Sequence, residues 1–163
     1  MIDKLLGAIQ NNEKLSEILK LVKSIGIYNS IKAIMRHPMF GGIVKNKVSE
    51  LYKALVNKYE ITAHSLKIVK TDDGYKVIAT ITIPDPKLRK DFLERLRDTI
   101  KNILTAKELT IVQPFMNEFQ IRNISAKENE SREEVTISLF GNEKLYGLIK
   151  EIGGDFVEEV EES

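Results

Sequence analysis

The residues of this chain that could do chemistry are few and widely spaced. His37 and His64 are its two histidines, and it has no cysteine. A zinc site needs three or four converging ligands, and a nucleophilic triad needs a base together with a third group that orients it. The sequence around either histidine supplies neither set. We therefore predict no catalytic residues, no metal and no cofactor, and we expect a protein that is not an enzyme.

Two adjacent carboxyl groups, Asp72-Asp73, could suggest acid–base work. They precede Gly74 and lie between two segments of alternating polarity, which is typical of a β-hairpin turn. Carboxyl groups at a hairpin tip are solvated, and nothing there prepares them to exchange protons with a substrate. The simpler interpretation is a turn.

The glycine pair in RHPMFGGIVKNK, Gly41-Gly42, could suggest a phosphate-binding loop. A loop of the Walker type follows a strand and ends in Gly-Lys-Ser or Gly-Lys-Thr. Here the glycines follow a segment of helical period and precede Ile43 and Val44. We interpret the stretch as a turn between two helices, with His37 as a cation near the carbonyl end of the first helix.

The elements that position these residues fall into two groups. Apolar residues recur every three or four positions over the first 60 residues, and from residue 65 they alternate. Ser30 is placed to cap the third helix, which Pro38 cannot continue. Asp85 and Asn142 are placed to cap two later helices. The patterns predict helices at 2–10, 14–24, 30–37, 42–58, 86–104 and 142–152, a hairpin at 65–83, strands at 108–113, 117–124 and 133–139, and a polar loop at 125–134.

This order of elements predicts an α+β fold. Residues 1–62 would form a helical bundle, and residues 63–163 a two-layer domain of antiparallel sheet and helices. The second part is compatible with a ferredoxin-like sandwich that has one extra strand from the 117–139 pair. The helix at 86–104 mixes cations such as Arg89 with acids, which indicates a solvated face. The ending DFVEEVEES is either a last edge strand or a solvated tail.

Charge is distributed unevenly along the chain. Residues 1–60 carry 10 basic and 5 acidic side chains, whereas residues 127–163 carry 4 and 11. Either the basic front faces an anion while the acidic end contacts a protein partner, or the two ends neutralise each other. The sequence has no apolar run long enough to cross a membrane and no signal peptide at its start. We expect a cytoplasmic protein without membrane contact.

The helices at the front and the hairpin resemble winged-helix, helix-turn-helix transcription regulators of archaea, over about residues 14–83. In that resemblance, helix 42–58 enters the major groove of double-stranded DNA. The chain departs from the family pattern in one respect. His37-Pro38 stands where a glycine usually ends the second helix, and the turn after that helix is longer. The resemblance implies that helix 42–58 contacts DNA bases through Lys45, Asn46, Lys47 and Lys53. It implies that the hairpin contacts phosphates through Lys67, Lys70 and Lys76.

Residues 75–161 resemble Lrp-like regulators in element order alone, and in that family a ferredoxin-type domain dimerises and senses small molecules. The leading hypothesis is therefore a DNA-binding transcription regulator, acting as a homodimer. Two alternatives remain open. One is a non-enzymatic assembly or adaptor protein that uses its helices and its acidic C-terminus for protein contacts. The other is a carrier for a small ligand, with a cavity between the sheet and helix 86–104.

Overall fold

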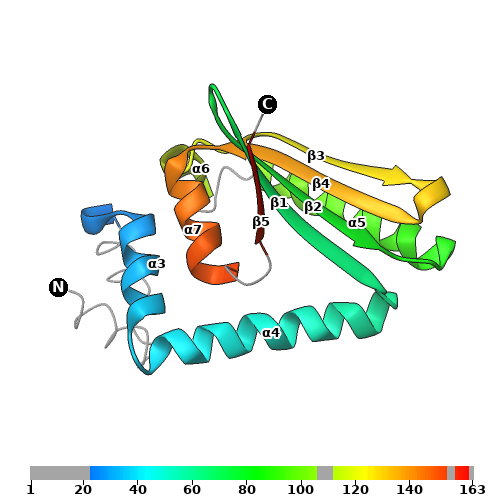
Figure 1. Ribbon diagram of the computed structural model, residues 1–163, viewed down its shortest axis with the longest axis horizontal. Helices are drawn as coiled ribbons and strands as arrows, with labels where there is room; N and C mark the ends of the chain where they lie inside the picture. The colour runs from blue at the N-terminus through cyan, green and yellow to red at the C-terminus, as the bar shows by residue number, and fades with distance from the viewer. Residues whose placement is uncertain (1–22, 106–111, 154–156, 162–163) are drawn as a thin grey trace.

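A computed structural model describes residues 23–105, 112–153 and 157–161 (Figure 1). The fold is α+β, as predicted, with helices leading into a sheet on which further helices pack. The predicted helix 2–10, nearly all of helix 14–24 and most of strand 108–113 lie outside the described residues. The elements are α3 (Ile27–Arg36), α4 (Phe40–Tyr59), β1 (Ala63–Thr71), β2 (Gly74–Thr82), α5 (Pro86–Thr105), α6 (Val112–Glu118), β3 (Arg122–Asn129), a short 3-10 helix (Glu130–Arg132), β4 (Glu134–Gly141), α7 (Glu143–Gly153) and β5 (Val157–Glu161).

The sheet has five strands in the order β3-β4-β2-β1-β5. The first four pair antiparallel, and β5 runs parallel to β1 at the edge. Thr71 pairs with Gly74, which puts Asp72-Asp73 at the hairpin tip and confirms the predicted turn. From β2 onward the principal elements follow the β-α-β-β-α-β order of a ferredoxin-like domain. β1 precedes that order along the chain and lies between β5 and β2 in the sheet. The ferredoxin-like assignment stays a prediction.

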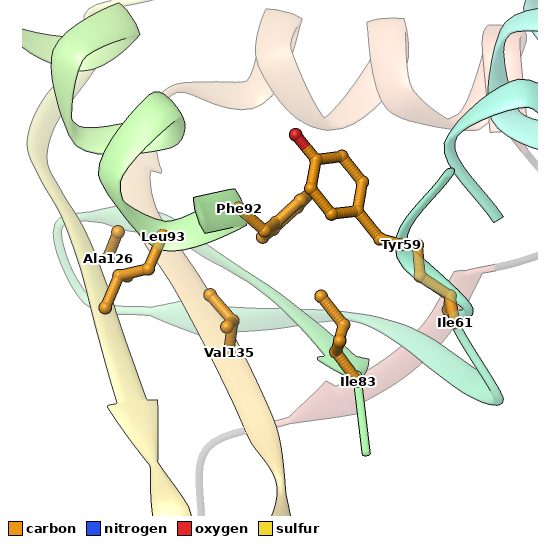
Figure 2. Packing of buried hydrophobic residues seen from close by; sticks show 7 residues of the cluster. All are labelled: Tyr59, Ile61, Ile83, Phe92, Leu93, Ala126 and Val135. Carbon is orange, nitrogen blue, oxygen red and sulfur yellow. The ribbon is translucent and has the colours of Figure 1, made fainter. Parts of the chain in front are cut away.

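The core lies between one face of the sheet and the helices. Successive residues of a strand point to opposite faces. On the face that carries the helices, Val77 of β2 is buried under α7, and Ile83, just after the end of β2, is buried under α5. One buried cluster, drawn in Figure 2, consists of Tyr59, Ile61, Ile83, Phe92, Leu93, Ala126 and Val135. The other consists of Ile27, Ile68, Val77, Phe119, Leu145 and Leu148.

The front helices and the sheet region share both clusters. The Tyr59 ring, from the end of α4, stands edge-on to Phe92 of α5, with centroids 5.0 Å apart (Figure 2). Ile27, from the start of α3, packs in the cluster that holds Phe119 and Leu148. The predicted boundary after residue 62 thus falls between α4 and β1, but core packing continues across it.

The N-terminus of α3 is capped by a residue from α6. The amides of Ile27 and Tyr28 donate to the two carboxylate oxygens of Glu118, at 2.8 and 2.6 Å. The residue before the helix, Gly26, has no side chain to offer. A carboxylate at this position satisfies two amides that lack partners within the helix and favours the positive end of its dipole. Glu118 therefore ties the front of the chain to the sheet region.

The prediction for residues 117–134 is wrong in part. Residues 112–118 form a helix, and β3 covers 122–129, so the strand begins and ends later than predicted. Phe115 and Phe119 lie one helical turn apart and pack into the second cluster. β3 is an edge strand. Lys127 and the other polar residues at alternate positions of β3 face away from the helices, so the sequence of this strand resembles that of a loop.

The predicted caps at Asp85 and Asn142 are confirmed, but the one at Ser30 is wrong. Helix α3 begins at Ile27, three residues earlier than predicted, so Ser30 lies inside it and its hydroxyl donates to the Gly26 carbonyl. One charged residue also lies where it was not expected. Asp85 Oδ1 accepts from the amides of Lys87 and Leu88, and Asn142 Oδ1 accepts from that of Leu145. Arg89, predicted to be solvated, is only 4% exposed. Its guanidinium donates to Glu128 and to the Ile83 carbonyl, both at 2.7 Å, which joins α5 to β3 and to the end of β2.

Candidate functional site

Residues 37–39 form the turn between α3 and α4, as predicted for this stretch. His37 Nδ1 accepts hydrogen bonds from the amides of Met39 and Phe40, both at 3.2 Å. The His37 side chain therefore satisfies amides at the start of α4. Its predicted role as a cation near the carbonyls of α3 stays a prediction.

Helix α4 has apolar residues on two sides. Tyr52, Val56 and Tyr59 face the rest of the protein. A second row is exposed along the flank of the helix, with Val48, Leu51 and Leu55 at 43%, 59% and 42% exposure. We call this second row, which also includes the half-buried Val44, the outer row. Its four members are Val44, Val48, Leu51 and Leu55.

The four α4 residues predicted to contact DNA are exposed but point in three directions. With 3.6 residues per turn, Asn46 and Lys53 lie on the side opposite the outer row. Lys47 flanks that row, and its ammonium is 3.8 Å from Glu50. Lys45 lies on the side that faces β1 and lines a cleft there.

The predicted phosphate contacts on the hairpin are also divided. Lys70 pairs with Tyr75, whose ring stacks on a tyrosine of α7, so Lys70 is on the face of the sheet that carries the helices. Lys67 and Lys76 lie on the opposite face, where the Lys76 ammonium sits 5.7 Å from the Phe140 ring centre. The structure does not bring the seven predicted residues together on one surface.

A cleft of about 510 Å³ lies between α4, the β1–β2 hairpin and the end of α7. Chain direction explains its position, because only three residues separate the end of α4 from β1, which runs back above the helix at an angle (Figure 1). The wall from α4 consists of Lys45, Val48, Ser49 and Tyr52. The sheet contributes His64, Ser65, Leu66, Ala79 and Ile81. The end of α7 contributes Lys150, Glu151, Ile152 and Gly153.

Two aromatic residues meet at one end of the cleft. The Tyr52 hydroxyl is hydrogen-bonded to His64 Nδ1, and the two rings stand edge-on with centroids 4.9 Å apart. Burial raises the pKa of Tyr52 above its ordinary value. Its hydroxyl is therefore protonated at neutral pH. Tyr52 and His64 form a hydrogen-bonded pair that links α4 to β1.

An ion pair holds the opposite end of the cleft. Arg36, in the last turn of α3, donates to Glu151 of α7, with the nearest nitrogen 2.6 Å from the carboxylate. Tyr28 of α3 also lies against Gly147, where an added Cβ would be 2.1 Å from the tyrosine hydroxyl oxygen. These contacts position the end of α7 relative to α3 and the start of α4.

Sequence reasoning did not find this cleft. It placed the alternative cavity against helix 86–104, but Phe92 and Leu93 of α5 pack directly on the sheet there. The cleft has one local signal, the recurrence of Lys45, Ser49 and Tyr52 on one side of α4. That spacing indicates a shared face, but it does not show which strand lies opposite.

No protein-family model matches the chain, and neither a curated protein nor a solved structure is significantly similar to it. The resemblance to winged-helix and Lrp-like regulators accordingly stays a prediction. Of the helices within the described ranges, none is long and apolar enough to cross a membrane. The same ranges hold no group of three or more metal-ligating side chains.

Proposed function

We propose that this protein is a non-enzymatic assembly protein that pairs with a second copy of itself through the outer row of α4. The supporting observation is the exposure of this row, at 42–59% for three of its four members. Single exposed apolar residues are common, but a contiguous row along a helix is typical of an interaction surface.

The spacing of the outer row suits a helix partner. Its members follow one another at intervals of four, three and four residues, which is the spacing of the buried positions in a coiled coil. In an antiparallel pair, Val44 is level with Leu55 of the second copy, and Val48 with its Leu51. Each level then holds one valine and one leucine, so the two helices stay evenly spaced.

Charge favours the antiparallel arrangement over the parallel one. Lys58 occupies the next position along the outer row, three residues after Leu55. A parallel pair would place this lysine against its own counterpart, at a cost from like charges. An antiparallel pair places it level with Gly41. The row spans about 16 Å of helix, which is short for a stable interface, so we expect a weak and reversible dimer.

A second candidate function is binding of double-stranded DNA by α4. It is supported by the side of the helix opposite the outer row, where Asn46 and Lys53 are exposed after a three-residue turn. In an antiparallel pair formed through the outer row, these two sides would point away from each other. Such a dimer could not place both helices in grooves on one side of a duplex. The two candidates therefore predict different assemblies.

Sedimentation equilibrium over a concentration series tests the assembly function. We expect the wild type to be a concentration-dependent dimer and Leu51→Glu/Leu55→Glu to be a monomer throughout. The matched control is Asn46→Glu/Asn57→Glu, which adds the same charge at exposed positions on the other side of α4. Circular dichroism verifies that each variant is folded. A wild type that stays monomeric at every concentration, or a control that also dissociates, contradicts the proposal.

Duplex DNA titrations over a salt series test the second candidate. If this side of α4 contacts phosphates, Lys53→Ala should reduce the slope of log affinity against log salt by about one. Loss of Asn46 alone should change sequence preference more than the slope. Absence of binding at about 50 mM salt would exclude this candidate.

A further inference from the structure

We infer that the cleft between α4 and the β1–β2 hairpin is a binding site for a small carboxylate with an apolar body. This inference goes beyond the assembly function and does not depend on it, because only Val48 belongs to both the cleft and the outer row.

The size and shape of the cleft suit such a ligand. Its volume of about 510 Å³ lies within the ordinary range of small-molecule sites, roughly 300–1,000 Å³. Lys45 and Tyr52 both line it and are seven residues apart on α4. That separation corresponds to about 10 Å along the helix axis. An elongated molecule of that length can contact both residues.

The walls between these two residues are mainly apolar. Leu66, Ala79 and Ile81 line the cleft from the sheet, Val48 from α4, and Ile152 from α7. Leu66 pairs with Ala79 across the two strands, and the small alanine side chain leaves room above it. Burying a hydrocarbon chain against these residues would contribute about 25 cal/mol per Å² of apolar surface removed from water.

The charges of the cleft favour an anion. Lys45 makes no ion pair or hydrogen bond within the part of the chain that the structure describes. The acidic residue of the lining, Glu151, already accepts two hydrogen bonds from Arg36. Ser49, one helical turn after Lys45, also lines the cleft and has a hydroxyl able to donate. A carboxylate beside Lys45 and Ser49 would find a cation and a neutral donor.

The other end of the cleft is aromatic. Tyr52 and His64 are hydrogen-bonded to each other. Burial, by raising the pKa of Tyr52, keeps the tyrosine neutral. Its ring therefore offers an apolar surface to the end of a hydrocarbon chain. Lys45 thus lines one end of the cleft and the rings of Tyr52 and His64 the other, which suits a molecule with a carboxylate at one end and an apolar body.

Octanoate is a suitable first probe, with octanol as its uncharged counterpart. Each is titrated into the isotopically labelled full chain and followed by two-dimensional amide NMR. We expect saturable shifts centred on Ser49, Tyr52, Leu66 and Ala79, with octanoate binding about fivefold or more tightly than octanol. Equal affinity for the two probes would overturn the assignment to carboxylates. Shifts that do not saturate, or that spread evenly over the protein, would overturn the site itself.

Variants of the helix wall provide the second arm. Ser49→Trp fills the cleft from an exposed helix position, so it leaves the fold intact and should weaken octanoate binding at least about tenfold. Lys45→Ala should weaken octanoate binding about fivefold and leave octanol binding unchanged. The matched control is Lys53→Ala, which removes an exposed lysine from another side of α4. It should change neither octanoate affinity nor octanol affinity. Wild-type affinity in Ser49→Trp would overturn the proposal.

Discussion

A Cβ atom on Gly41 would lie 2.2 Å from the carbonyl oxygen of Met35. The first turn of α4 therefore passes so close to the end of α3 that only glycine fits. The neighbouring Gly42 has nothing within 4 Å of its hypothetical Cβ. The two adjacent glycines consequently have different roles, and the close approach at Gly41 explains the path of the chain through this turn.

Substituting each glycine by alanine separates these roles. Gly41→Ala should lower the free energy of unfolding by about 1–3 kcal/mol, because backbone atoms must move apart. Gly42→Ala should raise it by up to about 1 kcal/mol, because alanine is the better helix former. Urea denaturation of the two variants beside the wild type measures both changes. Equal effects would show that the crossing at Gly41 does not constrain the fold.

Arg89 is a buried cation whose loss should be costly. Replacing it by leucine leaves the Glu128 carboxylate and the Ile83 carbonyl without their partner. We expect Arg89→Leu to lower the free energy of unfolding by about 3 kcal/mol. Arg95→Leu is the control, since Arg95 is exposed and pairs with Asp91 on the helix surface, and it should cost less than about 1 kcal/mol. Chemical denaturation at neutral pH compares the two.

Tyr59 should make the stability of the fold depend on alkaline pH. Burial, followed by the hydrogen bond to Asp91, raises the pKa of Tyr59 above 10.0. When folding raises a group's pKa, that group stabilises the fold fully at pH values below its unfolded-state pKa. This stabilisation is lost as the pH rises through its folded-state pKa. We expect Tyr59→Phe to lower the free energy of unfolding by about 1 kcal/mol at pH 7. Above pH 10, the difference in free energy of unfolding between this variant and the wild type should become smaller. A difference that stays constant with pH would contradict this.

The cap that Glu118 provides to α3 should contribute measurably to stability. Glu118→Ala leaves the amides of Ile27 and Tyr28 without an acceptor and should lower the free energy of unfolding by about 1–3 kcal/mol. Glu118→Gln keeps one oxygen acceptor and should have a smaller effect. Glu143→Ala, an exposed change in the first turn of α7, is the control and should stay within about 0.5 kcal/mol. The expected order is testable by thermal or urea unfolding.

Local sequence signals predicted most of the elements. Helices α4, α5 and α7 have strong apolar periods, and Asp85 and Asn142 mark the starts of two of them, so their ends were predicted within about two residues. The edge strand β3 was predicted only in part, because one of its faces is open and polar. α6 was missed because its seven residues give too short a period to separate helix from strand.

Contacts between distant residues could not be predicted in the same way. Arg89 has the local pattern of a solvated helix residue, and only the position of Glu128 on β3 explains its burial. The sequence indicated that Lys45 lies on a helix, but its place in the cleft depends on β1 running back over α4. The cap at α3 likewise depends on Glu118, which is 91 residues away from Ile27.

This last separation has a consequence for synthesis on the ribosome. At about 5–20 residues per second, α3 emerges roughly 5–20 s before the carboxylate that caps it. During that interval Ile27 also lacks Phe119 and Leu148, the cluster residues that cover it in the finished protein. A nascent chain therefore exposes its front helices to chaperones and proteases until α6 and α7 have been made. α3 is thus translated well before most of the residues that cover it in the folded protein.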